Sequence, residues 1–388
     1  MKGRFLLVLA IMLALISAGC STKSSSAKTD SGDWLKEAKL DQTETVDELY
    51  EQAKKEGKVV VYSQSSRIKD VKASFEKQYP GIKVEAHDIS SNEMVEKIVR
   101  EQDAGLHNVD VVFIKDTSGI VSKELLKEGR LHKYAPDDIT KNIHEQFKDH
   151  PGLPFYFSAD TVFFNTEKYK EAPVTNWWDL TDPEWKSKVV MPDPLVSAGT
   201  LDLLATMVQN SDEMAEAYKE KYGEEIKLNG TENAGYEFIK RLLDNDPIFS
   251  KSSGDVTTSI GTPGQDDPPI GIAGSSKARN IEDEGLKMAY TYDLKPRMSI
   301  PGTSYLYVAD KADNTAAAKL LIRWMAGEAD GKAEGFSPYN VLGSWSTRTD
   351  VEQHPEQRPM EELNLWKYDP EYLYQHVQEI KDFIMTNQ

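Results

Sequence analysis

The sequence predicts an α/β protein with two lobes. Its 388 residues correspond to two or three domains at roughly 100–200 residues per domain. Between residues 45 and 116, helical patterns alternate with short apolar runs that are typical of buried strands. Strands separated by helices favour right-handed βαβ crossovers and a parallel sheet that is covered on both faces.

The composition excludes several classes of protein. The chain has 46 Lys and Arg against 64 Asp and Glu, a formal charge of −18. This balance excludes a simple nucleic-acid binder, because that affinity comes from basic side chains that neutralise phosphates. Seven Trp, 17 Tyr and 12 Phe exclude a disordered acidic tail. The single cysteine can form neither an internal disulfide nor a thiolate metal cage, and we expect no cofactor.

The elements of the first lobe follow from local patterns. The first helix begins at a capping box, Thr45 to Glu48, and ends at Gly57. The strand over 59–62 is continuously apolar and β-branched, as expected for burial on both faces. Next come a helix around Val71 and Phe75, a strand over 82–86, a helix opened by a second capping box from Ser90 to Glu93, a strand over 109–114 and a helix over 120–129.

The residue composition of the predicted elements changes after the first lobe. Aromatic and β-branched strands are predicted at 154–157 and 161–165, near a change of domain. Further strands are predicted at 189–191, 270–273 and 304–308, and helices after Ser197, around 236–243 and over 316–325. The last forty residues are predicted to be largely helical, and the sequence leaves open which lobe carries them. Trp177 and Trp178 could stack on a ring, but their position favours a packing role.

The first residues predict a secretory signal. Lys2 and Arg4 precede an apolar run over 5–16, which is too short to span a bilayer, and small residues lead to Cys20. The pattern resembles a bacterial lipobox with Cys20 lipidated, and an ordinary cleaved signal is the alternative. Residues 1–19 are therefore expected to be a signal peptide, and residues 20–43 a flexible linker between a lipid anchor and the folded protein.

Several motifs carry a resemblance to a known family. They are Tyr62-Ser63, the segment 178–186 (WDLTDPEWK), Met191-Pro192-Asp193-Pro194 before Ser197, the helix 316–325 and Tyr339-Asn340-Val341. Together they resemble the solute-binding proteins of ABC transporters, in the group that binds ferric iron and related small anions. The resemblance implies a type 2 periplasmic-binding-protein fold: two Rossmann-like lobes, joined by two crossing segments, that close like a hinge on a ligand in the cleft.

The resemblance also implies the domain organisation and the partners. Lobe one is expected to cover 44–155, lobe two 156–294, and the return to lobe one with the C-terminal helices 295–388. The expected partners are a membrane permease and its ATPase, with the protein a lipid-anchored or periplasmic monomer outside the cell membrane.

Hydroxyl-rich segments follow several predicted strands, where parallel sheets bind ligands. Helix N-termini there offer free N–H groups and about half a positive charge to an anion. Ser and Thr are also the commonest helix caps, so each cluster alone is more readily a cap than a site. The predicted ligand-binding residues are Ser63, Ser65, Ser66, Arg67, Asp116, Thr117, Ser158, Ser197, Ala198, Gly199, Thr200, Ser275 and Ser276.

The resemblance implies that the family's iron binders carry a pair of tyrosines at the strand-to-helix turn of lobe two and a histidine after the first strand, and the corresponding turns carry Ser275-Ser276 and Ser65-Ser66 here. Serine hydroxyls do not replace phenolates as ligands of a hard ferric ion. We therefore expect a small organic anion, phosphorylated or phosphonate-like, with ferric iron or a ferric chelate as the alternative. A secreted lipoprotein hydrolase and an adhesion or scaffold lipoprotein are rival classes, although the sequence has no P-loop, nucleophile elbow or His-Glu-x-x-His motif.

Overall fold

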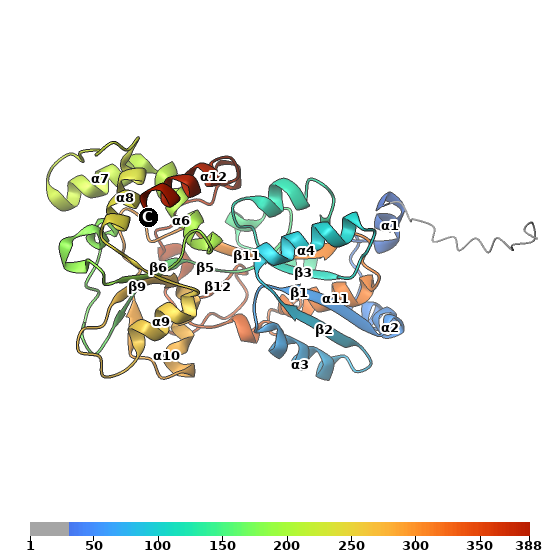
Figure 1. Cartoon of the computed structure of the whole chain (residues 1–388). Coiled ribbons are helices and arrows are strands. Elements are labelled where there is room, and N and C mark those ends of the chain that lie inside the picture. The colour runs from blue at the N-terminus through green and yellow to red at the C-terminus, as the bar shows by residue number, and fades with distance from the viewer. Residues whose placement is uncertain (1–30) are drawn as a thin grey trace, which may run out of the picture. The chain divides into compact units, whose positions relative to one another are not determined.

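The computed structural model describes residues 31–388 (Figure 1). The predicted signal peptide and Cys20 lie outside the described residues. The chain divides into Met1–Glu37 and Ala38–Gln388, and the second unit carries both sheets. Within the predicted flexible linker the structure has a helix, α1 (Ser31–Ala38), which the sequence interpretation missed. Among the described residues, no helix has both the length and the hydropathy to cross a membrane.

Lobe 1 is built on a seven-stranded sheet with the order β12-β5-β11-β3-β1-β2, in which β4 also pairs with β11. As predicted, β1 runs parallel to both β2 and β3. The strand β11 returns late in the chain and pairs antiparallel with β3. The strands are β1 (Lys58–Ser63), β2 (Lys83–Asp88), β3 (Val111–Lys115), β4 (Leu131–His132), β5 (Leu153–Ser158), β11 (Gly302–Ala309) and β12 (Trp345–Ser346).

The helices of lobe 1 begin and end largely where their capping signals predict. Thr45 and Glu48 form the complete capping box, and Gly57 ends the helix in the left-handed conformation. Ser90 accepts a hydrogen bond from the Glu93 N–H, but the return contact of the second predicted capping box is absent. The helices are α2 (Val46–Glu56), α3 (Ile68–Gln78), α4 (Ser91–Asp103), η1 (Val121–Leu125), α5 (Asp137–Thr140), η2 (Glu145–Phe147), α11 (Thr315–Met325) and η6 (Ser337–Tyr339). The helix predicted over 120–129 is the single π-helical turn η1.

Lobe 2 is built on a five-stranded sheet with the order β10-β6-β9-β7-β8. Here β7 runs parallel to β8 and β9, while β6 pairs antiparallel with β9. The strands are β6 (Asp160–Asn165), β7 (Val189–Pro192), β8 (Ile248–Ser250), β9 (Ile270–Gly274) and β10 (Met288–Tyr290). The helices are η3 (Trp177–Thr181), η4 (Pro183–Trp185), α6 (Ala198–Gln209), α7 (Ser211–Tyr222), α8 (Ala234–Asp244), α9 (Ser253–Gly261), η5 (Ser275–Arg279) and α10 (Asn280–Asp283). The prediction of an α/β fold with two lobes is confirmed.

The core of lobe 2 explains the tryptophan pair. Trp177 and Trp178 are both fully buried, and Trp178 makes edge-to-face contacts with Tyr218 and Phe238. Each indole N–H donates to a backbone carbonyl, so neither polar group is left unsatisfied. The packing role predicted for this pair is confirmed.

The chain passes between the two sheets three times. The first passage, from β5 to β6, takes the single residue Ala159, and the second joins β10 to β11. After β12 the chain returns to lobe 2 through η7 (Met360–Glu362) and α12 (Pro370–Asn387). The resemblance implied two crossing segments, whereas the structure has a third one after β12.

The C-terminal helix α12 belongs to lobe 2. It packs on α6 and α8, and its residues Leu373, Ile380 and Ile384 are buried in the same core as Trp178 (Figure 1). The prediction that the last forty residues are largely helical is only partly right, because the segment between β12 and α12 contains just the short turn η7. Pro355 and Pro359 in that segment lack the N–H that a continuous helix needs.

The same C-terminal segment also contacts lobe 1. The Tyr368 hydroxyl donates to the backbone carbonyl of Asp116 and accepts from the Gly119 N–H. Lys123 forms an ion pair with Glu371 at the start of α12. The residues after 365 therefore bridge the loop after β3 and the core of lobe 2.

Gly235→Ala tests how α8 supports α6. A Cβ at Gly235 would lie 2.4 Å from the Val208 Cα, so α8 approaches the backbone of α6 directly. We expect this variant to lower the free energy of unfolding by about 1–3 kcal/mol, because overpacking forces the two helices apart. The matched control is Gly254→Ala, where the added Cβ meets nothing closer than 3.4 Å. Urea unfolding measures both, and equal stabilities for the two variants would contradict this account of the α6–α8 contact.

Candidate functional site

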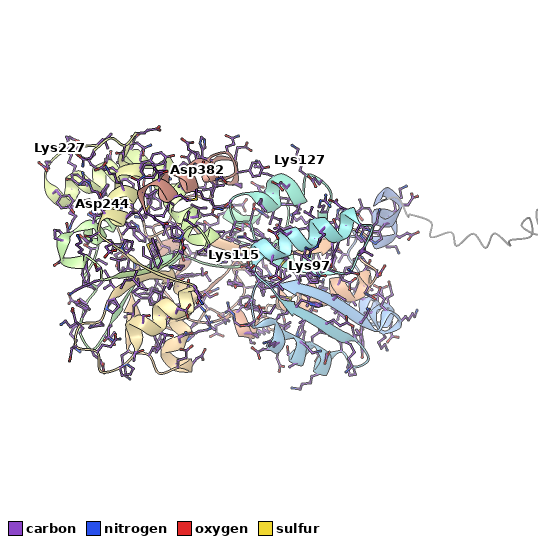
Figure 2. The ribbon with its side chains drawn as sticks, in the orientation of Figure 1. Lys97, Lys115, Lys127, Lys227, Asp244 and Asp382 are labelled. Carbon is purple, nitrogen blue, oxygen red and sulfur yellow. The ribbon has the colours of Figure 1, made fainter. Side chains whose placement is uncertain are left out.

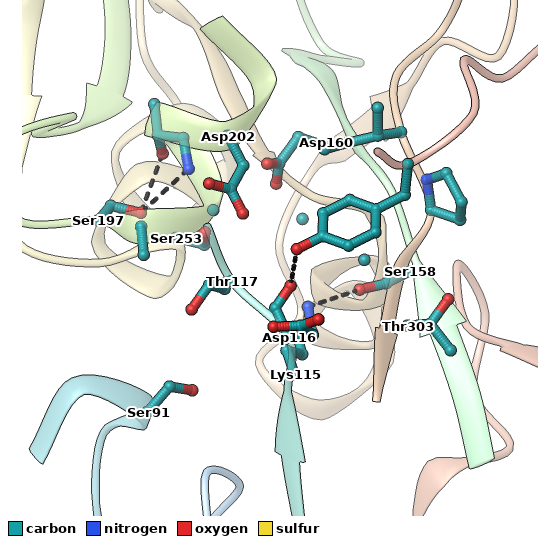
Figure 3. Close-up of a pocket in the computed structure, with 18 of the residues that line it drawn as sticks. Ser91, Lys115, Asp116, Thr117, Ser158, Asp160, Ser197, Asp202, Ser253 and Thr303 are labelled. Carbon is teal, nitrogen blue, oxygen red and sulfur yellow. Dashed lines mark hydrogen bonds between the residues drawn. The ribbon is translucent and has the colours of Figure 1, made fainter. Parts of the chain in front are cut away.

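The candidate site is a cavity of about 490 Å³ lined by segments of both lobes (Figure 3). Lobe 1 contributes the residues after β2 and β3, together with the start of β11. Lobe 2 contributes the residues after β7 and β9 and the start of α9. The cavity thus lies at the carboxyl ends of parallel strands in both sheets, where open α/β sheets bind ligands.

Three helices point their N-termini at this cavity. They are α4 in lobe 1 and α6 and α9 in lobe 2, capped by Ser90, Ser197 and Ser252. At α6 the Ser197 hydroxyl accepts from the Thr200 N–H, which leaves the Ala198 and Gly199 N–H groups with no partner among residues 31–388. Unpaired N–H groups and the positive end of a helix dipole both favour an anion.

Two lysines add full positive charges to the wall. Lys115 ends β3, and its ammonium lies 3.5 Å from the Ser158 hydroxyl, at the long limit of a hydrogen bond. Gly302 leaves room for it, because a Cβ there would lie 3.1 Å from the Lys115 Nζ. Lys277 follows β9, and a Cβ at Gly254 in the first turn of α9 would lie 3.5 Å from its Nζ. Figure 2 shows Lys115 where the two lobes meet and Lys127 on the outside of lobe 1.

Lys277 stands in an unfavourable electrostatic environment. Burial lowers its pKa, and the neighbouring Arg279 and Arg67 lower it further. Among the described residues, no side chain or carbonyl accepts a hydrogen bond from its ammonium. Glu284 and Asp255 oppose this lowering of the pKa, and a bound anion would add to their negative charge and supply the missing acceptor.

Two of the three carboxylates in the wall already have hydrogen-bond donors. Asp116 accepts from the N–H groups of Val121 and Ser122 and from the Ser122 hydroxyl, so it caps η1. Asp202 on α6 accepts from the Ser118 N–H at 2.9 Å and from the Ser118 hydroxyl at 2.9 Å. Because Ser118 follows β3 and Asp202 lies in lobe 2, this contact joins the two lobes.

The third carboxylate, Asp160, is the first residue of β6. Figure 3 shows it beside Asp202 in the cavity, with Lys115, Asp116 and Ser158 nearby. Burial raises the pKa of Asp160, and the positive charge of Lys115 opposes this rise.

The structure brings most of the predicted residues to this one cavity. Those that line it are Asp116, Thr117, Ser158, Ser197, Ala198, Gly199, Thr200 and Ser276. They come from both lobes and from four separate segments of the chain, so the hydroxyl-rich turns after β3, β7 and β9 share a single site. Their role in binding stays a prediction.

The first predicted cluster does not line the cavity. The Ser63 hydroxyl is buried and donates to the Ser65 carbonyl, so it shapes the turn after β1. Arg67 donates to the Pro338 carbonyl and to the Tyr156 hydroxyl, which ties this turn to the rest of lobe 1. Ser66 is likewise outside the cavity wall. Its carbonyl accepts a hydrogen bond from the Lys69 N–H in the first turn of α3.

Ser275 is also absent from the cavity wall. Its side chain is fully buried, and its hydroxyl donates to the Gly343 carbonyl and accepts from the Ala159 N–H. The backbone N–H of Ser275 donates in turn to the Ala159 carbonyl. This serine therefore holds the passage between the sheets, and its neighbour Ser276 is the one that faces the cavity.

The sequence interpretation missed several charged residues of the wall. Asp202 lies inside the apolar helix sequence LDLLATMV, and Asp160 lies between the aromatic runs of residues 154–157 and 161–165. An isolated carboxylate within an apolar run was the signal that could have identified both, because a buried charge needs a partner. Lys115 gave no such signal, since a lysine at the end of a strand is ordinary.

The described residues contain no cluster of three or more His, Cys, Asp or Glu side chains arranged to hold a metal ion. The phenols in the wall, Tyr305 and Tyr368, are not adjacent in the sequence. Tyr368 already bonds to the loop after β3, and Tyr305 stacks on His150 with ring centroids 3.5 Å apart.

Comparisons with known proteins agree with this architecture. In sequence, the chain is 24% identical over 328 residues to the spermidine/putrescine-binding periplasmic protein 1 of Haemophilus influenzae, covering 78% of this chain and 82% of that protein. In structure, it is similar to iron-bound HitA from Pseudomonas aeruginosa, with a TM-score of 0.65 and 14% identity over 84% of this chain and 99% of that one. It is also similar to AfuA from Actinobacillus pleuropneumoniae with bound fructose-6-phosphate, with a TM-score of 0.62 and 20% identity over 84% and 97% of the two chains.

These structural neighbours confirm the two-lobed fold of type 2 periplasmic binding proteins, and their different ligands show that this fold does not fix the solute. The family model for bacterial extracellular solute-binding proteins matches residues 70–370, which include the whole cavity wall and every strand of the two sheets except β1. The chain belongs to the family of bacterial extracellular solute-binding proteins.

Proposed function

We propose that this protein is the substrate-binding component of an ABC importer and captures a small organic anion, phosphorylated or phosphonate-like, in the cavity between its lobes. The observation that supports this most is the convergence of three helix N-termini and two lysines on one cavity. Phosphate and phosphonate groups have several acceptor oxygens, which match the free N–H groups of Ala198 and Gly199. A cavity of about 490 Å³ suits a small solute.

Iron and polyamines are the alternatives that the similar proteins suggest. A bare ferric ion prefers hard, anionic oxygen ligands, whereas the three helix N-termini and the two lysines present positive charge. A polyamine would bring two or more positive charges next to Lys277, whose pKa is already lowered by burial, Arg279 and Arg67. The two lysines and the free N–H groups at the start of α6 therefore favour an anionic group over either cation.

Closure on the solute is part of this proposal. Ligand contacts from both lobes at once favour the closed arrangement, and Lys115 from lobe 1 and Lys277 from lobe 2 are placed to make them. The hydrogen bonds between Ser118 and Asp202 join the lobes directly at the edge of the same cavity.

We propose lipid anchoring through Cys20 and delivery of the solute to a membrane permease with its ATPase. The expected state is a monomer without catalytic activity. Turnover of chromogenic esters or phosphate esters would instead support the lipoprotein-hydrolase alternative.

Lys277→Met tests the anion site. We expect it to weaken binding of ethylphosphonate by about tenfold to a hundredfold, because it removes one charge-assisted hydrogen bond. Lys127→Met is the matched control, since Lys127 is exposed and lies away from the cavity (Figure 2). Isothermal titration calorimetry compares the two variants with the wild type for ethylphosphonate, a hexose phosphate, ferric citrate and putrescine. Tight binding of ferric citrate or putrescine with no binding of either phosphorus compound would contradict the proposed function.

Asp202→Asn tests the contact between the lobes through its pH dependence. Burial raises the pKa of Asp202 from 3.8 to about 7 in the folded protein. The stability that this raised pKa contributes is fully present below pH 3.8 and is lost as the pH rises to about 7, because only the unfolded state releases the proton in that range. The difference corresponds to about 4 kcal/mol in the free energy of unfolding.

We expect Asp202→Asn to remove that part of the pH dependence, and urea unfolding between pH 4 and pH 8 measures it. The control is Asp244→Asn, which replaces an exposed carboxylate at the end of α8. An unchanged slope in the Asp202 variant would show that this carboxyl titrates normally in the folded protein.

A further inference from the structure

One carboxylate in the cavity has no internal partner. Among residues 31–388, no N–H or hydroxyl donates to the side chain of Asp160, and no ion pair within 4.0 Å holds it. Asp116 and Asp202 in the same wall each accept at least two hydrogen bonds from the protein. Asp160 is thus the only one of these three carboxylates with both oxygens free for a solute.

Two glycines place this carboxylate next to the proposed anion site. A Cβ at Gly199 would lie 3.9 Å from one Asp160 oxygen, and a Cβ at Gly274 would lie 3.6 Å from the other. Gly199 is in the first turn of α6, whose free N–H groups are proposed to hold the anionic group of the solute. The Asp160 carboxylate therefore lies immediately beside the place where that negative charge would bind.

The groups of the protein around Asp160 do not compensate its negative charge next to a bound anion. Burial disfavours its ionised form and Lys115 favours it, while its negative charge raises the pKa of the nearby Asp202. The positive end of α6 favours a nearby negative charge, yet no N–H of that helix donates to Asp160. A solute that presented only negative charge at α6 would be repelled by this carboxylate.

We infer that the solute is a short zwitterion, in which an ammonium group lies close to the anionic phosphorus group and donates hydrogen bonds to the unpartnered Asp160 carboxylate. This inference rests on the proposed function, because the anionic group defines the neighbouring half of the site. An ammonium between the two negative groups satisfies both, and its N–H donors supply the hydrogen bonds that Asp160 lacks.

The arrangement also sets the length of the solute. Asp160 adjoins the same helix turn that carries the free N–H groups, so the ammonium must lie within a few bonds of the anionic group. Lys277 adjoins the first turn of a different helix, α9, in the same cavity wall. Aminoalkyl phosphonates and phosphates with short chains have this chemistry.

The test compares two probes that differ only in the ammonium group, 2-aminoethylphosphonate and ethylphosphonate. Calorimetry measures both with the wild type, with Asp160→Asn and with the control Asp244→Asn, whose carboxylate is exposed on lobe 2 away from the cavity (Figure 2). In the wild type we expect the amino compound to bind about tenfold or more tightly than ethylphosphonate. Asp160→Asn should abolish this preference, and the control should keep it.

Ethylphosphonate separates the two proposals and also reports on folding. Asp160→Asn should bind it as well as the wild type or better, because a neighbouring negative charge is removed. Equal affinities of the two probes in the wild type, or an unchanged preference in Asp160→Asn, would overturn the zwitterion inference while anion capture stands. Failure of both probes to bind the wild type would overturn the proposed function, and the inference with it. Loss of both probes in Asp160→Asn, with a normal circular dichroism spectrum, would show that Asp160 supports binding of the anionic group itself and would overturn the inference.

Discussion

The arrangement of the site depends on how the chain passes from one sheet to the other at Ala159. This residue is buried, and both its N–H and its carbonyl are bonded to Ser275, whose hydroxyl also bonds to Gly343 in lobe 1. Three segments that are distant in the sequence are thereby fixed at one point. Ser158 and Asp160, on either side of Ala159, are held in the cavity wall by this set of hydrogen bonds.

The cavity combines charges of both signs, and the protein treats them differently. Positive charge comes from fixed backbone dipoles and from lysines without full hydrogen bonding, so it is available to a solute. Most of the negative charge is already used within the protein, by Asp116 in capping η1 and by Asp202 in joining the lobes. The remaining carboxylate, Asp160, gives the site its asymmetry.

Much of the fold could be predicted from the sequence because its signals are local. The capping box at Thr45, the buried run over 59–62 and the cap at Ser197 each act within one turn or one strand. A serine after a strand can cap a helix, bond to another segment of the protein or face a solute, and the positions of distant segments decide which. For that reason the sequence could not show that Ser275 is buried and that Ser276 faces the cavity. Lys115 and Asp160 become parts of one cavity wall only in the folded protein, where segments of both lobes come together.

The C-terminal bridge affects how such a protein would release what it holds. Tyr368 contacts the loop after β3 and Glu371 pairs with Lys123 in η1, while Leu373, Ile380 and Ile384 of α12 are buried in the core of lobe 2. If the lobes move apart, either these side-chain contacts break or α12 loses its packing against the core of lobe 2. The ease of unloading is consequently governed in part by the ion pair between Lys123 and Glu371, which is not part of the lining, so two relatives with identical linings could exchange their cargo at different speeds.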